Sequence, residues 1–136
     1  MKLEQKAAIV TGGSGGIGEA ICLRLASEGT KVVVNCRSHH DTQDTKEKIE
    51  QIGSQAYIVK ADLGKVEQLD NLVKESIDRF GKVDILVNCA GLEKRADFWD
   101  VTEADYDLVM NVNLKEVFFV TQAVVNHFKT GCFCRF

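Results

Sequence analysis

The stretch TGGSGGIG, residues 11–18, decides the fold, because it places five glycines between two different hydrophobic patterns. The apolar run KAAIV, residues 6–10, precedes it and is too short for a helix, so it predicts a buried strand. From Ile17 to Glu28 the apolar residues follow a helical stripe that stops near Gly29. A glycine-rich turn between a strand and a helix is typical of a phosphate-binding loop, where unpaired N–H groups face the anion.

Within this loop, three glycines and one serine have an expected task. We expect Gly12 to allow the sharp turn out of the strand, Gly16 to leave room for a diphosphate, and Gly18 to let the helix pack closely. Ser14 would add a hydroxyl donor. A P-loop would instead need Gly-Lys-Ser/Thr at the helix start, where this chain has Gly-Glu-Ala. A glycine turn that serves packing alone is the remaining alternative.

Strand and helix patterns alternate along the rest of the chain. Short runs rich in β-branched residues predict buried strands at 31–36, 55–62 and 83–91. Helical spacing of apolar residues predicts helices over 41–52 with Ile49 and Ile52 facing inward, over 69–80, from the N-cap Thr102 onward, and over 114–129. Parallel strands joined by amphipathic helices predict the α/β class, with a doubly wound Rossmann-type sheet in a single domain over residues 1–136.

Composition narrows the class of protein further. The hydrophobic fraction of 45% is ordinary for a globular protein. The net charge of −3 does not favour binding to nucleic acid or to an anionic membrane. No apolar run reaches the ~18 residues that span a bilayer, and the opening MKLEQK does not resemble a signal peptide, so a cytoplasmic location is expected. We expect free thiols and no metal site from the five cysteines, Cys22, Cys36, Cys89, Cys132 and Cys134.

Arg37 and Ser38 follow the second predicted strand, where NAD-binding proteins usually carry an acidic residue for the ribose hydroxyls. A guanidinium beside a hydroxyl suits a 2′-phosphate, because arginine binds phosphate through a planar fork. The sequence therefore favours NADP, with NAD possible. A solvated loop arginine is the alternative.

Three more stretches complete a family pattern: KADLG around Asp62, LVNCAG ending at Gly91, and MNVNLKEVFFVTQAV around Asn113. Together with residues 11–18, they resemble the classical short-chain dehydrogenase/reductase family, and most closely its glucose 1-dehydrogenase-like and 3-oxoacyl-carrier-protein reductase-like members. The resemblance covers only the N-terminal half of such an enzyme, so the sheet would be truncated after about its fourth or fifth strand. It implies hydride transfer between a nicotinamide and a small carbonyl or alcohol substrate.

The resemblance also implies roles for single residues. Asp62 would hydrogen-bond the adenine ring, and Asn113 would help to organise a catalytic proton relay, with the helices around it packing between subunits of a homo-oligomer. Cys89 stands where the family has a second Asn. Capping of strand ends is the alternative for Asp62 and Asn88. The implied cofactor-binding residues are Gly12, Ser14, Gly16, Ile17, Gly18, Arg37, Ser38, Asp62, Leu63, Asn88, Ala90 and Gly91.

The family's catalytic Ser and Tyr-x-x-x-Lys have no counterpart in these residues. The only tyrosines are Tyr57 and Tyr106, and Met110 rather than lysine stands four residues after Tyr106. The final TGCFCRF also departs from the family pattern. We therefore expect a chain that is inactive as it stands. A non-catalytic nucleotide-binding or assembly module and a frameshifted product without function remain alternatives, and in each the fourth strand would be an exposed edge prone to pairing.

Overall fold

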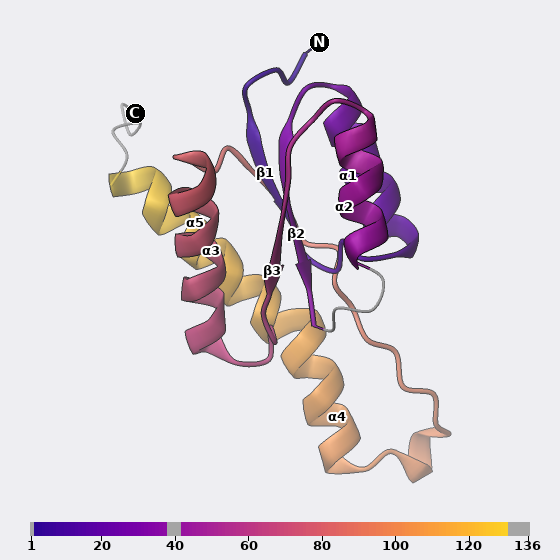
Figure 1. Cartoon of the computed structure of the whole chain (residues 1–136). Coiled ribbons are helices and arrows are strands. Elements are labelled where there is room, and N and C mark those ends of the chain that lie inside the picture. The colour runs from indigo at the N-terminus through magenta and orange to yellow at the C-terminus, as the bar shows by residue number, and fades with distance from the viewer. Residues whose placement is uncertain (1, 38–41, 131–136) are drawn as a thin grey trace.

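The computed structural model describes residues 2–37 and 42–130, which form one four-stranded parallel sheet with helices on both faces (Figure 1). The strand order is β3-β2-β1-β4, which confirms the doubly wound Rossmann-type architecture. The strands are β1 (Ala7–Val10), β2 (Lys31–Cys36), β3 (Ala56–Lys60) and β4 (Ile85–Val87). The main helices are α1 (Gly16–Ser27) and α2 (Thr42–Gln51) on one face, and α3 (Val66–Phe80) and α5 (Glu116–Thr130) on the other.

Each face of the sheet carries its own hydrophobic core, because neighbouring residues of a strand point to opposite sides. Ile9 packs toward α3 and α5, whereas Val10 packs toward α1 and α2. α1 buries three small residues at a spacing of four, which lets it lie close to the sheet: Gly18, Cys22 and Ala26. The predicted stripe was wrong at Ile17, whose side chain is 76% exposed at the start of the helix.

Helix ends follow the sequence signals closely. Gly81 ends α3 in the left-handed conformation (φ +79°), and the predicted apolar stripe of that helix faces the core. The Thr102 hydroxyl accepts a hydrogen bond from the backbone N–H of Asp105, as expected of an N-cap. Ile52 was expected to face inward but is 46% exposed, because α2 ends one residue before it.

Three cysteines lie within the described residues, and all are free thiols: Cys22, Cys36 and Cys89. Burial, and next the proximity of Cys89, raise the pKa of Cys22 to about 12. Its thiol donates a weak hydrogen bond to the carbonyl of Gly13. Cys22 is therefore an inert core residue. The expectations for Cys132 and Cys134 lie outside the described residues.

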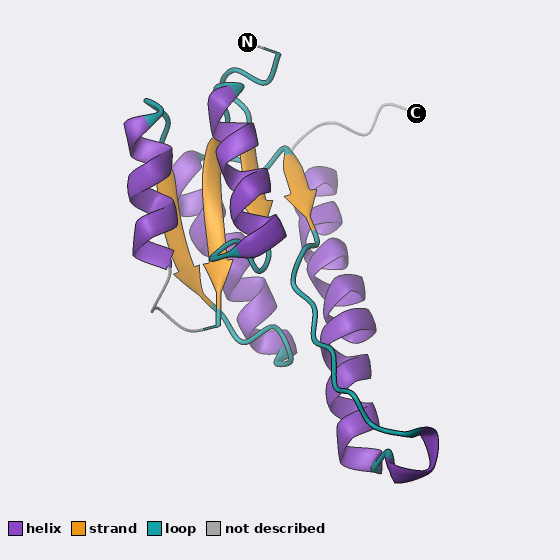
Figure 2. Ribbon diagram, turned by 90° about the vertical axis from the view of Figure 1, so that its right-hand side faces the viewer, coloured by secondary structure: helices purple, strands orange, loops and turns teal. Residues whose placement is uncertain are grey.

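The longest helix of the described chain is continuous from α4 (Glu103–Met110) through a π-helical turn η2 (Asn111–Lys115) into α5. α4 extends beyond the sheet, and the loop that follows β4 runs along it to the short 3₁₀ helix η1 (Phe98–Asp100) (Figure 2). The sequence predicts two helices here and gives no sign of the π turn. Such turns are frequent at functional sites.

By length and composition alone, this helix could also cross a membrane. It spans 27 residues, Glu103–Lys129, and its most apolar 18-residue window has a mean hydropathy of 1.3, with 17% of that window buried. The sequence analysis considered only uninterrupted apolar runs and therefore passed over this window, which contains Lys115, Glu116 and uncharged polar residues. In this structure Val120 and Val124 of the same helix pack into the core beneath the sheet.

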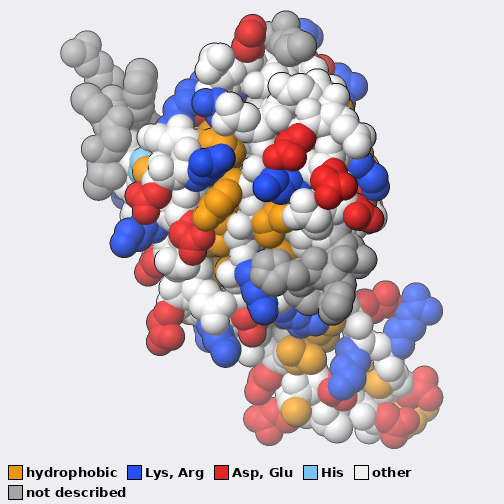
Figure 3. Space-filling model, viewed as in Figure 1, with side chains coloured by type: hydrophobic (Ala, Val, Ile, Leu, Met, Phe, Trp, Pro, Cys, Tyr) orange, Lys and Arg blue, Asp and Glu red, His pale blue; other side chains and the backbone are white. Residues whose placement is uncertain are grey.

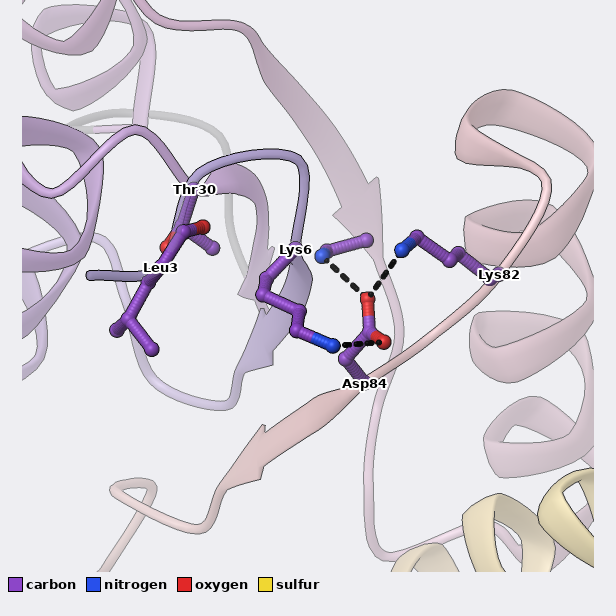
Figure 4. A network of polar contacts seen from close by, with 6 residues as sticks. Leu3, Lys6, Thr30, Lys82 and Asp84 are labelled. Atoms are coloured by element: carbon purple, nitrogen blue, oxygen red, sulfur yellow. Dashed lines mark hydrogen bonds and ion pairs between the residues drawn. The ribbon is translucent and has the colours of Figure 1, made fainter. Parts of the chain in front are cut away.

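At the edge of the sheet opposite the strands' carboxyl ends, Asp84 joins the segment that begins β1 to the segment that begins β4 (Figure 4). Its carboxylate accepts hydrogen bonds from the backbone N–H of Ala7 (2.9 Å) and from Lys6 (3.3 Å), and pairs with Lys82 (3.2 Å). Partial burial opposes ionisation, but these three partners outweigh it and hold the pKa of Asp84 below its ordinary value. The network fixes the start of β1 against the start of β4.

Candidate nucleotide-binding site

A cavity of about 220 Å³ opens where the carboxyl ends of β1, β2 and β3 meet the start of α5. In doubly wound sheets, this edge is where ligands bind. Six of the predicted site residues line it: Gly12, Ser14, Arg37, Asp62, Leu63 and Ala90. The cavity wall does not include the other described candidates, Gly16, Ile17, Gly18, Asn88, Gly91 and Asn113. Ser38 lies outside the described residues.

Two glycines of the loop leave no room for a side chain. Gly12 adopts φ +62°, and a Cβ there would lie 2.8 Å from Cα of Ala90. A Cβ on Gly18 would lie 2.1 Å from the carbonyl oxygen of Gly12, far inside contact distance. Gly18 thus packs α1 against the loop itself. Gly16 adopts φ +53° with open space around it, which leaves its surroundings accessible to a ligand.

Thr11 connects the loop after β1 to the loop after β4, although the sequence did not single it out. Its buried hydroxyl accepts hydrogen bonds from the backbone N–H groups of Cys89 and Ala90, both at 3.1 Å. These two residues follow β4 in the chain, 78 and 79 positions away. One hydroxyl therefore holds two walls of the cavity together.

Asn35 connects the end of β2 to the end of β3, as Thr11 connects the loops after β1 and β4. Its buried side-chain amide donates to the carbonyls of Val59 (3.2 Å) and Ala61 (3.4 Å). The backbone carbonyl of Asn35 accepts a hydrogen bond from the N–H of Gly13 (3.0 Å). Arg37, two residues further, is exposed at the cavity edge and pairs with no acidic side chain among the described residues. Its guanidinium is thus available to a ligand.

The Asp62 carboxyl has one anchored oxygen and one open oxygen. Oδ1 accepts a hydrogen bond from the N–H of Gly64 (3.1 Å), which is the local capping weighed as an alternative. Oδ2 has no partner among the described residues, although Asp62 lines the cavity. Its backbone N–H donates to the Gln68 side chain (2.7 Å). Capping thus holds Asp62 in place without consuming its ability to accept a hydrogen bond.

Asn88 and Asn113 lie beside the cavity and tie the β4 loop to the long helix. Asn88 donates to the Thr121 hydroxyl at 3.2 Å. The Asn113 side chain, within the π turn, both accepts from the N–H of Leu92 and donates to its carbonyl, each at 2.8 Å. This two-way pairing fixes the loop to the helix at the point where the helix changes register.

Glu116 is the residue that sequence reasoning missed. It lies at the start of α5 and lines the cavity with only 2% of its surface exposed. Burial, and then the nearby Asp62, raise the pKa of its carboxyl to about 7. Glutamate after lysine in an amphipathic stretch looks like a solvated position, so no signal in the sequence pointed to it.

Two other hollows among the described residues are larger, at about 310 and 370 Å³, but neither suits an anionic ligand. The first lies at the opposite edge of the sheet, beside the residues that end α1 and α2. Helix C-termini direct carbonyl oxygens outward and repel phosphate. The second is a shallow site lined by Tyr57, Glu75, Asp78 and Arg79.

Comparison with known proteins gives the same family that the motifs resemble. The family model described as short chain dehydrogenase matches residues 6–132. Hydroxynaphthalene reductase-like protein of Metarhizium robertsii is 40% identical over 130 residues, covering 95% of this chain and 49% of its own. The 2-dehydro-3-deoxy-D-gluconate 5-dehydrogenase of Escherichia coli is 39% identical over 127 residues, covering 93% and 49%.

A solved structure agrees in three dimensions. The short chain dehydrogenase of Burkholderia cenocepacia, determined in complex with NADP, superposes with a TM-score of 0.90 at 38% identity, over 93% of this chain and 52% of that one. The chain belongs to the short-chain dehydrogenase family. It spans about half the length of the relatives it matches.

Proposed function

We propose that this chain is the cofactor-binding half of an NADP-dependent short-chain oxidoreductase that acts on a small carbonyl or alcohol. The observation that carries the proposal is the cavity itself, in which the glycine loop, Arg37 and Asp62 converge on one edge of the sheet. When bound, the nicotinamide cofactor would supply the hydride chemistry.

The residues fit such a dinucleotide at several points. The first turn of α1 presents unpaired N–H groups, and the absence of a side chain at Gly16 leaves the loop backbone there open to a diphosphate. Arg37 would bind the 2′-phosphate, and Asp62 Oδ2 would accept from the adenine ring. Asn88, Ala90 and Gly91 would lie along the nicotinamide half, as the family resemblance implies.

Cofactor selectivity tests the role of Arg37. Replacing Arg37 by aspartate removes a charged hydrogen bond and adds repulsion, so NADPH affinity should fall about 10- to 100-fold while NADH affinity rises. Fluorescence titration of the reduced nicotinamide measures both. Lys74→Glu is the control, because it makes the same change of charge at an exposed position of α3 remote from the cavity. An unchanged preference would remove Arg37 from the site, and a chain that binds neither nucleotide would refute the proposed function.

A turnover assay tests whether this chain only binds the cofactor or can also carry out the reaction. The absence of the family's Tyr-x-x-x-Lys removes the acid/base group, a contribution worth about 10²–10⁴-fold in rate. The purified 136-residue chain should bind NADPH yet not oxidise it with a panel of small ketones, as followed by absorbance of the reduced cofactor. Oxidation that survives removal of host reductases, and that the Arg37 variant weakens, would show that this chain is catalytic by itself.

An assembly module is the second candidate, favoured by the surface of the long helix. Large apolar side chains are exposed along it, including Leu114 (59%) and Phe118 (60%), and hydrophobic groups lie among charged ones on the projecting end of the molecule (Figure 3). β4 also lies at the edge of the described sheet. Size-exclusion chromatography with light scattering would support this candidate by a defined oligomer, and a monomer or open-ended aggregate would contradict it.

A further inference from the structure

The nucleotide cavity holds a second carboxyl group besides that of Asp62. Glu116, at the start of α5, and Asp62, after β3, come from different elements and line the same 220 Å³ space. The Glu116 side chain forms no hydrogen bond or ion pair with any described residue, although its surface is 98% removed from solvent. A charged group buried without a partner costs several kcal/mol, so this position is unfavourable for the chain alone.

The Glu116 carboxyl is nevertheless not sealed inside the protein. Among the described residues, the only fully enclosed side-chain oxygen or nitrogen without a partner is Oγ1 of Thr45. The unpaired oxygens of Glu116 therefore keep a small opening, and Glu116 is one of the residues that line the cavity. A ligand placed there can supply the hydrogen-bond donors that the protein does not.

The chemistry of the two carboxyls limits what that ligand group can be. Asp62 Oδ2 and the Glu116 carboxyl are acceptors when ionised, so they repel phosphate and attract a neutral group with two N–H donors. The exocyclic amino group of adenine has two such donors, whereas hypoxanthine carries a carbonyl oxygen at the same position. Arg37, the cation on the cavity wall, comes from the end of β2 and suits the phosphate of the adjoining ribose instead.

We propose that Glu116 and Asp62 act as a pair that recognises the amino group of the adenine base, which makes Glu116 a specificity-determining residue for the nucleotide. The proposal rests on the proposed function, because it assigns a base to the cofactor site. Each carboxyl accepts one of the two N–H donors. An unfavourable buried charge of the free chain thereby becomes a favourable contact of the complex.

The test compares NADPH with its hypoxanthine counterpart, which differ only at the base and share the fluorescence of the reduced nicotinamide. Dissociation constants are measured at pH 8, where Glu116 is mainly ionised, for the unaltered chain, Glu116→Ala and Glu116→Gln. Glu103→Gln is the matched control, since Glu103 is exposed at the start of α4. Circular dichroism melts establish that each variant is folded.

We expect the unaltered chain and the control to prefer the adenine nucleotide. Glu116→Ala should lower that preference about tenfold through weaker adenine binding, while Glu116→Gln keeps part of it because an amide oxygen also accepts. Equal weakening of both nucleotides, or no change in either, would overturn the role of Glu116 and leave the proposed function intact. If the unaltered chain binds neither nucleotide, the proposed function fails and this inference fails with it.

Discussion

Gly18→Ala is expected to destabilise the folded chain by about 3 kcal/mol and to abolish nucleotide binding. The added Cβ would lie 2.1 Å from the carbonyl oxygen of Gly12, 2.8 Å from its carbonyl carbon and 3.0 Å from Cα of Gly13. All three are backbone atoms, so no side chain can move aside. Either α1 shifts away from the sheet or the loop opens, and each change disrupts the cavity wall.

Urea denaturation and NADPH titration measure these two consequences. Gly15→Ala is the matched control, because it adds the same methyl group to the same loop at a position with no atom within 4 Å and an extended backbone (φ −175°). It should cost less than about 1 kcal/mol, as a poorer N-cap. If the two variants unfolded at the same urea concentration, the close approach of Gly18 to Gly12 would not be a constraint on this fold.

Glu116→Gln is expected to stabilise the chain at pH 8 and to change its stability by less than about 1 kcal/mol at pH 5. The pKa of this carboxyl rises from an unfolded value near 4.5 to about 7 in the folded state. Between these values the folded chain retains a proton that the unfolded chain has lost, so stability falls as pH rises through this window and levels off above it. The loss is of order 3 kcal/mol, and the neutral amide avoids it.

The measurement is the free energy of unfolding of both chains at half-unit steps from pH 5 to pH 8. The difference between them should grow with pH and reach its full size just above 7. Glu103→Gln should follow the unaltered chain at every step, because that side chain is exposed. A constant difference between Glu116→Gln and the unaltered chain would mean that Glu116 titrates normally and is not desolvated.

The parts of the fold that the sequence predicted are those in which one face of an element must be buried. The stripe of α3 occurs on one side only, and Leu69, Leu72 and Val73 are indeed in the core. The long helix differs, because it carries apolar residues on two sides. Phe118 lies on the exposed stripe, while the buried stripe is formed by Glu116, Val120 and Val124. Both have helical spacing, so periodicity cannot choose between them.

The residues of the candidate site also fall into two groups, those that the sequence predicted and those that it did not. Arg37, which follows a predicted strand, and Asp62, which ends one, were placed at the cavity because strand ends of a parallel sheet meet at one edge. Thr11 and Asn35 were not, because their hydrogen bonds reach other strands whose register the sequence does not contain. Glu116 depends on the same kind of information, namely which side of a helix another element covers.

The strand order has a consequence for synthesis on the ribosome. β1, β2 and β3 are neighbours in both sequence and space, but β4 must pair with β1, joining Ala8 to Ile85. Translation from Lys60 to Ala90, at ordinary speeds of 5–20 residues per second, takes about 2–6 s. Throughout that interval the nascent chain carries its whole glycine loop, while the Thr11 hydroxyl lacks both of its donors and one side of β1 is an open edge that chaperones can bind. The cavity is thus completed late, because residues 89 and 90 must first reach Thr11 and Val112 and Glu116 must then supply its remaining wall.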